Sequence, residues 1–370
     1  MFVITNRCVF PDKKGFAIFG KRPSERGPNE LRLARVNRVS GKWKIQLLPD
    51  ELDDTTLAEI NVQREFDERG NPIPVYASRY VAYHLLKAVN PKRMGIKGGR
   101  GRNLVFFVHG FNNTVKDVVE RAEKLEKTYG VEVLVFTWPA NGGGARGVTD
   151  YLSDKRDARA SVGALDRCLA KLDSYLADFN DAWLKEIMCQ ARDKHGDDAE
   201  KRDEFIARMI RRGCPFTVNL FLHSMGNYLF KQVMKSGVYR GGRLIFDNVV
   251  LAAADVNNLD HALWVDRICS RNRIYITINE NDFALGASRM KAGEQQLARL
   301  GHCTHNLDSR LAVYVDFTHA AHVRNSHSYF EGKAVEKNPR VKEFFHQALN
   351  GECAEYSISY DEAKRLYRLR

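Results

Sequence analysis

The chain has 370 residues, of which 44% are hydrophobic and 28% are charged, so its composition is that of a globular protein and excludes wholesale disorder. This length can bury a large core in one α/β domain or in two domains. No apolar run approaches the roughly 20 residues of a membrane span. The N-terminal residues do not follow the pattern of a secretion signal, so the sequence predicts a cytoplasmic protein.

The charge is basic and is concentrated early in the chain. The formal net charge is +12, and residues 1–50 contain 11 Lys or Arg against 4 Asp or Glu, a net of +7. Such an excess can attract nucleic acid or anionic lipid. Because no recognition motif accompanies it, we expect a solvated basic surface and no nucleic-acid site, while contact with a membrane surface stays open. The seven cysteines lack a CxxC pair and are expected to be reduced thiols.

Residues 1–76 are predicted to be a β-rich N-terminal segment packed on the core. Residues 1–5 are apolar, as in a strand. Residues 31–36 and 42–48 alternate apolar with polar or basic side chains, which is the period of half-exposed strands. Residues 77–89 follow with the pattern of an amphipathic helix.

In residues 77–350, short apolar runs alternate with segments that have the periodicity of an amphipathic helix. The apolar runs predict strands at residues 103–108, 131–136, 216–222, 248–253, 273–279 and 311–316. Besides the helix at residues 77–89, the predicted helices include residues 150–176, 259–270, 281–299 and 338–349. Runs that are apolar throughout are typical of parallel strands buried on both faces. This domain is therefore predicted to be a mostly parallel central sheet with helices on both faces.

Two further segments are expected to lie outside the sheet. Residues 178–213 are charged and favour helix, and they predict an inserted helical hairpin that turns at Gly196. The hairpin is either a partial lid or a contact between subunits, and the sequence favours neither. Residues 351–370 are predicted to be a C-terminal tail or helix.

The strongest chemical signal is the stretch 220–229, which has the sequence Leu-Phe-Leu-His-Ser-Met-Gly-Asn-Tyr-Leu. An apolar strand leads into a sharp turn centred on Ser224, and a helical pattern follows. This order makes up the nucleophile elbow of the α/β-hydrolase fold, which is the fold we predict. The general elbow has glycine two residues before the serine. Leu222 stands here instead and is expected to crowd the turn, so that either the elbow is looser or its neighbours are small.

A serine needs a base to activate it, and the base needs an acid to orient it. The chain supplies Ser224, Asp282 and His327 in the α/β-hydrolase order, with Asp282 and His327 after predicted strands. We expect a nucleophile at Ser224, a general base and then acid at His327, and an orienting carboxylate at Asp282. Asp282 can instead cap its own helix, and Asp255 is the rival acid.

The oxyanion hole is predicted from two backbone amides. The amide of Met225 follows the nucleophile, and the amide of Phe111 lies in the loop after the first core strand. Residues expected to support the site or line the substrate pocket are His109, Gly110, Trp138, His223 and Asp255. Gly110 would permit a close approach of the loop, and Trp138 can alternatively pack in the core.

Neither a metal nor an organic cofactor is expected. Five histidines are dense enough to suggest a metal, namely His302, His305, His319, His322 and His327. No acidic partner completes a helical zinc motif among them. We therefore expect ordinary loop histidines.

A series of motifs extends along most of the chain. They include Thr5-Asn6-Arg7, His109-Gly110-Phe111-Asn112-Asn113, His223-Ser224-Met225-Gly226-Asn227, Asn281-Asp282-Phe283-Ala284-Leu285 and His327-Ser328-Tyr329-Phe330. In this order the motifs resemble those of the bacterial α/β-hydrolases grouped as DUF900 in the esterase/lipase superfamily. The resemblance implies the α/β-hydrolase fold and a Ser-Asp-His hydrolase, with Ser224, Asp282 and His327 at the matched positions. It implies no substrate.

These motifs predict a serine hydrolase that acts on a carboxylic ester, either a small acyl ester or a lipid, through an acyl-enzyme at Ser224. The alternative is a hydrolase fold that binds or signals without catalysis, or that a partner activates, with its basic surface against a membrane or nucleic acid. Salt-dependent binding to polyanions without turnover would favour that alternative. The oligomeric state does not follow from the sequence.

Overall fold

The computed structural model describes residues 1–91, 101–140, 147–211, 216–236, 244–289 and 297–370. Its strands are β1 (Phe2–Thr5), β2 (Arg7–Val9), β3 (Phe19–Pro23), β4 (Arg32–Val39), β5 (Lys42–Leu47), β6 (Leu104–Val108), β7 (Glu132–Thr137), β8 (Val218–His223), β9 (Phe246–Ala252), β10 (Ser270–Ile278), β11 (Ala312–Asp316), β12 (Ser359–Asp361) and β13 (Leu366–Arg368). Its α-helices are α1 (Asp54–Glu59), α2 (Ala77–Val89), α3 (Val115–Tyr129), α4 (Gly147–Ala160), α5 (Val162–His195), α6 (Ala199–Arg211), α7 (Met225–Lys235), α8 (Ala262–Val265), α9 (Phe283–Arg289), α10 (Lys333–Lys337) and α11 (Pro339–Leu349). Two short 3₁₀ helices are η1 (Gly15–Ile18) and η2 (Leu300–His302).

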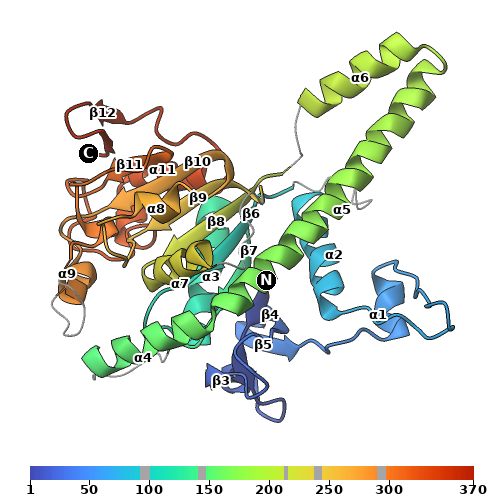
Figure 1. Cartoon of the computed structure of the whole chain (residues 1–370), viewed down its shortest axis with the longest axis horizontal. Helices are drawn as coiled ribbons and strands as arrows, with labels where there is room; N and C mark the ends of the chain where they lie inside the picture. Colours follow the sequence, from blue (N-terminus) through green and yellow to red (C-terminus); the bar gives the residue numbers. More distant parts are fainter. Residues whose placement is uncertain (92–100, 141–146, 212–215, 237–243, 290–296) are drawn as a thin grey trace.

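The centre of the molecule is an eleven-stranded sheet in the described residues, with the order β12-β13-β11-β10-β9-β8-β6-β7-β1-β4-β5 (Figure 1). Every pairing from β13 to β1 is parallel, and antiparallel strands lie at both edges. The predicted mostly parallel sheet with helices is therefore confirmed. Strands β2 and β3 form a small separate sheet.

The first strands of the chain belong to the central sheet. Strand β1 pairs with β7, and β4 and β5 continue the sheet from β1 to its edge. Three strands of the segment 1–76, which is predicted to be β-rich and to pack on the core, thus extend the central sheet. The alternating side chains of this segment arise because an edge strand has one face on the core and one in solvent.

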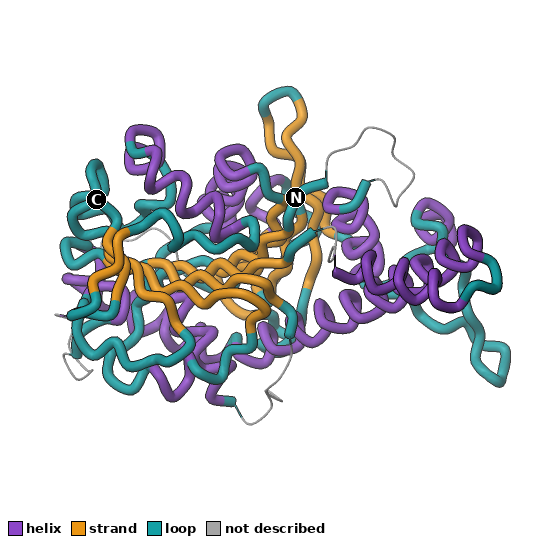
Figure 2. The backbone as a smooth tube through the Cα atoms, turned by 90° about the horizontal axis from the view of Figure 1, so that it is seen from above, coloured by secondary structure: helices purple, strands orange, loops and turns teal. Residues whose placement is uncertain are grey.

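Helices cover both faces of the sheet, as Figure 2 shows with the strands running between them. One core cluster holds side chains of α2, α5, α7 and α8, and the other holds side chains of α3 and α11. Residues of β6 alternate between them, with Phe106 and Val108 in the first cluster and Val105 and Phe107 in the second. Although α5 is long, no helix of the described residues is apolar enough to cross a bilayer.

The predicted helical hairpin exists, but its first helix begins much earlier than expected. Helix α5 runs without a break from Val162 to His195, past the predicted boundary at residue 177, and α6 follows the turn at Gly196. No glycine or proline occurs between residues 164 and 195 to end the helix. The outer part of α5 and α6 form an arm that extends from the body (Figure 1). Residues 212–213 of the predicted hairpin lie outside the described residues.

Three other predictions of local structure are wrong. The helix predicted at 259–270 is limited to Ala262–Val265, because β10 already begins at Ser270 and pairs there with β9. The helix predicted at 281–299 is present as α9 from Phe283 to Arg289, but residues 297–299 are not helical, and residues 290–296 lie outside the described residues. The tail or helix predicted at 351–370 is a hairpin, and its strand β13 pairs with β11. Long-range strand pairing overrides local helix preference in the first and third cases.

Glu126 gives the fold a pH dependence. Burial, followed by the charge of Glu132, raises the pKa of Glu126 to about 7 from an ordinary value of 4.5. Between these two values the folded state holds more protons than the unfolded state, so the free energy of unfolding falls as the pH rises through that window. We expect Glu126→Gln to be more stable than wild type by roughly 2 kcal/mol at pH 8 and equally stable near pH 4. The measurement is urea unfolding at both pH values.

The half-exposed Glu120 on the same helix provides the control. It forms a surface pair with Lys116 at 3.9 Å, and Glu120→Gln should not alter how stability changes between pH 4 and pH 8. An equal change in stability with pH for wild type and Glu126→Gln would contradict the assignment to Glu126.

Candidate active site

The register of the sheet brings several loops to one edge. Val108, Leu222 and Leu251 are neighbours in β6, β8 and β9, so these strands end level with one another. Polar residues then follow the carboxyl ends of the strands, where ligands bind in open α/β sheets.

Ser224 is held in a strained conformation between β8 and α7. Its φ of 54° and ψ of −122° are rare for any residue other than glycine. The strain is maintained by hydrogen bonds on both sides, since the Ser224 amide donates to Ala252 O (3.0 Å) and the Asp255 amide donates to Ser224 O (3.2 Å). The residue as a whole is 5% exposed. This is the geometry of a nucleophile elbow.

The elbow keeps this conformation with leucine two residues before the serine. Leu222 is fully buried and lies between Val108 and Leu251 in the sheet. Strand β9 ends at Ala252, and Ala253 and Ala254 follow it. A looser turn does not fit the structure, and the two sheet neighbours of Leu222, Val108 and Leu251, are not the small residues that we expected.

Asp282 and His327 are in direct contact. Asp282 Oδ2 lies 2.7 Å from His327 Nδ1. The other oxygen of the fully buried Asp282 accepts from the amides of Ala284 (2.9 Å) and Leu285 (3.1 Å) at the start of α9. The two roles considered for Asp282, helix cap and partner of the histidine, are thus divided between its two oxygens.

Two residues hold the loop that carries His327. The His223 Nε2 donates to the His327 carbonyl (3.1 Å), and the two rings lie 4.8 Å apart. Burial lowers the pKa of His223 well below its usual value, so this ring is neutral. The Asn279 side chain donates to the carbonyls of Arg324 (3.0 Å) and Ser326 (3.1 Å). His327 is thereby held next to the residue that precedes Ser224. The sequence did not single out Asn279, although an asparagine at the end of a strand before Asp282 was a usable signal.

Asp255 has a different partner. Its Oδ1 lies 3.2 Å from Arg299 Nε and accepts from the Ser288 hydroxyl at 2.7 Å. The side chains of Asp255 and Arg299 are both 4% exposed, so this is a buried ion pair. It joins the loop after β9 to α9 and to the segment before η2.

The loop after β6 packs directly on the serine. A Cβ atom on Gly110 would lie 2.5 Å from Ser224 Cβ and 3.0 Å from Ser224 Oγ. Gly226, two residues after the serine, is equally confined, because a Cβ there would lie 2.6 Å from the carbonyl oxygen of Val108. Glycine at these two positions lets the loop, the elbow and the first turn of α7 meet.

A buried network fixes the Gly110 carbonyl. The Trp138 amide lies 3.3 Å and the Thr137 hydroxyl 2.9 Å from His109 Nε2. An amide can only donate, so Nε2 is the unprotonated nitrogen and accepts these hydrogen bonds. Nδ1 then carries the proton and donates to Gly110 O at 2.8 Å. Burial, followed by the nearby charge of Arg7, lowers the pKa of His109 to about 3, so the ring stays neutral.

Arg7 connects this network to the N-terminal segment. Its guanidinium donates to Thr137 Oγ1 (3.3 Å) and to the carbonyls of Asn113 (3.2 Å) and Ala140 (3.3 Å). Burial lowers its pKa to about 10, so it keeps its charge at neutral pH. The sequence marked Arg7 only as part of a motif, and Thr137 was not singled out for a role.

Trp138 packs in the core, which is one of its two predicted roles. It is fully buried, its ring stacks on His109 at 5.4 Å and 2°, and its Nε1 donates to His109 O at 3.0 Å. It therefore stiffens the loop from behind the site and has no exposed surface to offer a ligand.

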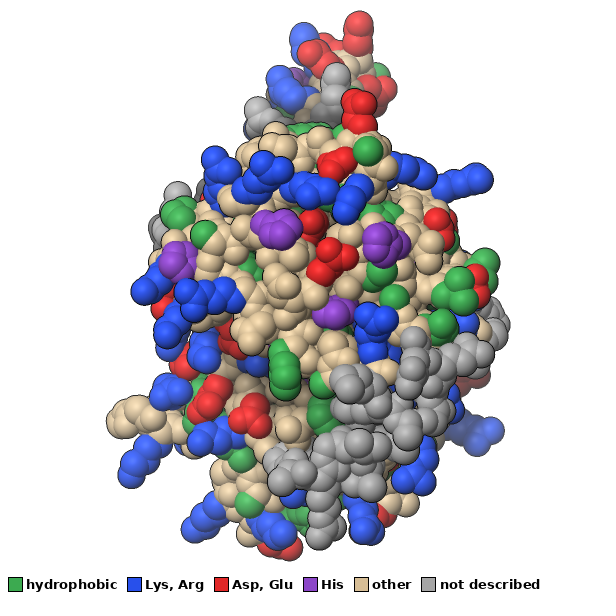
Figure 3. Space-filling view, turned by 90° about the vertical axis from the view of Figure 1, so that its left-hand side faces the viewer, with side chains coloured by type: hydrophobic (Ala, Val, Ile, Leu, Met, Phe, Trp, Pro, Cys, Tyr) green, Lys and Arg blue, Asp and Glu red, His purple; other side chains and the backbone are tan. Residues whose placement is uncertain are grey.

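The remaining histidines of the C-terminal loops do not gather around a metal. His319 and His322 are exposed. Within the described ranges, no three His, Cys, Asp or Glu side chains are arranged to hold a metal ion. Figure 3 shows the end of the molecule that carries α9, where histidine, acidic and basic side chains are interspersed.

One comparison with known proteins gives a match. The family model described as an alpha/beta hydrolase of unknown function (DUF900) matches residues 93–178 and 193–342. These ranges include Ser224, Asp282 and His327. No curated protein and no solved structure matches the chain.

Proposed function

The chain belongs to the α/β hydrolases of unknown function grouped as DUF900, and from this we propose that it is a serine hydrolase that cleaves carboxylic esters. One observation carries the proposal: the histidine of the 2.7 Å Asp282–His327 contact is held against His223, the residue that precedes a serine at φ 54°. A buried carboxylate on Nδ1 leaves Nε2 of His327 as the nitrogen that can accept a proton. A serine at a strained turn has its hydroxyl presented beyond the end of the sheet.

In the proposed reaction, Ser224 Oγ attacks the ester carbonyl carbon while its proton moves to His327 Nε2. Asp282 stabilises the imidazolium through Nδ1. Collapse of the tetrahedral intermediate breaks the bond to the alcohol, which leaves with the proton from His327. Water then attacks the acyl-enzyme, again losing its proton to His327, and the products are a carboxylic acid and free Ser224.

The amides of Phe111 and Met225 are proposed to bind the oxyanion. In a trans peptide the C=O and N–H groups point in opposite directions, so fixing the Gly110 carbonyl also aims the Phe111 amide. His109 (2.8 Å) and the Asn113 side chain (3.2 Å) both donate to that carbonyl. The buried network around Arg7 and Thr137 would then act by preorganising a donor before the substrate arrives.

Labelling with a fluorophosphonate probe tests the proposal. The probe reacts with an activated serine, and we expect one adduct per chain, located on the tryptic peptide that contains Ser224. Hydrolysis of p-nitrophenyl esters of increasing chain length then tests the ester preference. Labelling only at other residues, or equal labelling of native and heat-denatured protein, would overturn the proposal.

Gly110→Ala is expected to lower kcat by roughly 100-fold, since a displacement of about 1 Å at a reacting group can have that effect. The new Cβ would lie 2.5 Å from Ser224 Cβ, so either the loop or the serine must move. The measurement is kcat on a p-nitrophenyl ester, with the melting temperature recorded to separate misfolding from misplacement.

Gly286→Ala is the matched control. Its Cβ would come no closer than 3.8 Å to His302 Nε2, which is ordinary contact. Alanine is also the better helix former within α9. Equal kcat values for the two variants would contradict the close contact between Gly110 and Ser224.

A further inference from the structure

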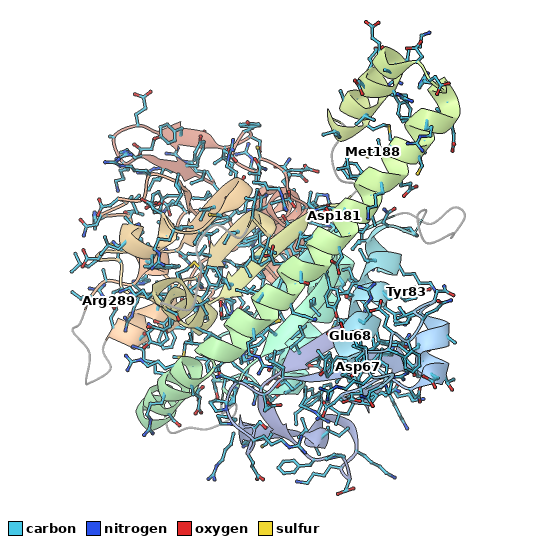
Figure 4. The ribbon with its side chains drawn as sticks, turned by 45° about the vertical axis from the view of Figure 1, so that its right-hand side comes forward. Asp67, Glu68, Tyr83, Asp181, Met188 and Arg289 are labelled. Atoms are coloured by element: carbon cyan, nitrogen blue, oxygen red, sulfur yellow. The ribbon has the colours of Figure 1, made fainter. Side chains whose placement is uncertain are left out.

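A long groove lies between α2 and α5, away from the candidate active site. Its larger part has a volume of about 730 Å³, and a smaller part of about 260 Å³ continues it; Ala82, Leu86 and Tyr175 line both. Along α5 the lining extends from Arg167 to Ala182, about 22 Å of helix. Figure 4 shows α5 passing beside α2, which carries Tyr83, on its way to the arm with Met188. We call this feature the α2–α5 groove.

The floor and walls of the α2–α5 groove are apolar. They include Leu33, Leu85, Leu104, Leu134, Leu172 and Phe216. Leu33, Leu86, Leu172 and Leu176 pack against the core but are only partly buried, so part of their apolar surface stays accessible in the groove. A concave apolar site of this volume is typical of a pocket for a small molecule.

Polar contacts join the two helices across the groove. The Ser78 and Tyr175 hydroxyls lie 2.9 Å from each other, and Arg79 pairs with Asp178 at 3.5 Å. These bridges connect α2 to α5 and fix the position of the two helices on either side of the groove.

The mouth of the groove has a surplus of positive charge. Arg167 and Lys171 line it from α5 and are exposed. Arg167 donates to Asn29 O (2.7 Å), and the Lys171 ammonium lies 5.0 Å from the Tyr175 ring. Among the described residues neither forms an ion pair. Two acidic residues also line the mouth, but Asp50 is paired with Arg32 at 2.6 Å. Two cations against the one remaining carboxylate, Glu30, leave one net positive charge.

We propose that the α2–α5 groove binds a long-chain fatty acid, with the acyl chain along the leucines and the carboxylate at Arg167 and Lys171. A single long chain matches the elongated apolar lining of the groove along α5, and a carboxylate complements the cations at its mouth. The groove is a separate site from Ser224, because none of its lining residues belongs to the elbow or to the loops that carry Gly110, Asp282 and His327. Phe216 precedes β8 and is eight residues from Ser224, which is about 26 Å along an extended chain.

Displacement of anthroyloxy-labelled stearate by palmitate, measured by fluorescence on the full chain, tests this site. We expect one palmitate per chain and equal affinity in wild type and Ser224→Ala, because the groove does not include the serine. Laurate should bind at least tenfold more tightly than dodecylamine. This outcome does not depend on ester hydrolysis, so the proposed function and the fatty-acid site can fail separately.

Two kinds of variant locate the ligand. Ala82→Phe places a ring where both parts of the groove meet and should abolish binding, whereas Ala177→Phe, on an exposed position of α5, should not. Arg167→Gln with Lys171→Gln should weaken binding about tenfold. The control is Lys185→Gln with Arg192→Gln, which removes two exposed cations farther along α5 and should leave the affinity unchanged.

Several outcomes would overturn the site. The first two are absence of palmitate binding and equal affinity for laurate and dodecylamine. The third is purely competitive inhibition of ester hydrolysis by palmitate. The fourth is full affinity for palmitate in both the Ala82→Phe and the Arg167→Gln/Lys171→Gln variants. Circular dichroism of Ala82→Phe shows whether it folds. The charge variant lies on the surface and gives an answer even where Ala82→Phe does not fold.

Discussion

Ser224→Ala is expected to lower kcat for p-nitrophenyl ester hydrolysis by at least about 10⁴-fold, because the hydroxyl is the group that forms the acyl-enzyme. The fold should be retained, since the substitution only removes Oγ from a residue that is 5% exposed. The fluorophosphonate adduct should disappear together with the activity. Steady-state kinetics and intact-mass analysis of wild type and variant measure both effects.

Ser224→Gly is the companion variant. It should be as inactive as Ser224→Ala but more stable by about 1 kcal/mol, since φ 54° and ψ −122° favour glycine. Residual activity within tenfold of wild type in either variant would show that another residue is the nucleophile. Equal stabilities would show that the turn is not strained.

Asp282→Asn is expected to lower kcat by about 10⁴-fold with little change in fold. The asparagine oxygen can still accept from the amides of Ala284 and Leu285, which lie 2.9 and 3.1 Å from the present Oδ1. Its amide group would then face His327 Nδ1, which favours the wrong tautomer of the histidine. Kinetics and thermal unfolding of the same preparation separate catalysis from stability.

Asp255→Asn should have the opposite profile. It removes the negative charge from the buried ion pair with Arg299, which we expect to destabilise the protein by roughly 3–5 kcal/mol. Its kcat should stay within about tenfold of wild type, because Asp255 lies against Arg299 and Ser288 rather than His327. The reverse ranking of the two kcat values would make Asp255 the acid of the triad.

The sequence predicts those parts of the fold and site that depend on local pattern. The apolar runs located the parallel strands, and the turn around Ser224 identified the elbow. The order Ser224, Asp282, His327 then selected two residues that the structure brings together as a contact of 2.7 Å. Each of these signals is contained in a few consecutive residues or in the order of the motifs.

The remaining features depend on partners that are distant in the sequence. Helix α5 has no local boundary at residue 177, and β13 becomes a strand only because β11 offers an edge. Asn279 positions the histidine loop through carbonyls 45 and 47 residues away. Thr137 matters because its hydroxyl meets His109 and Arg7. Sequence periodicity does not carry information about such contacts.

The pairing of β6 with β8 also has a consequence for how the chain folds. Asn103 and Thr217, which share a hydrogen bond at the start of this pair, are 114 residues apart. Closing so long a loop is slow compared with forming helices, whose contacts are local. Helices α5 and α6 meet across a short turn and can form first. The elbow serine reaches its final geometry only after β6, β8 and β9 have come together, so recovery of labelling at Ser224 during refolding should trail the recovery of helical circular dichroism.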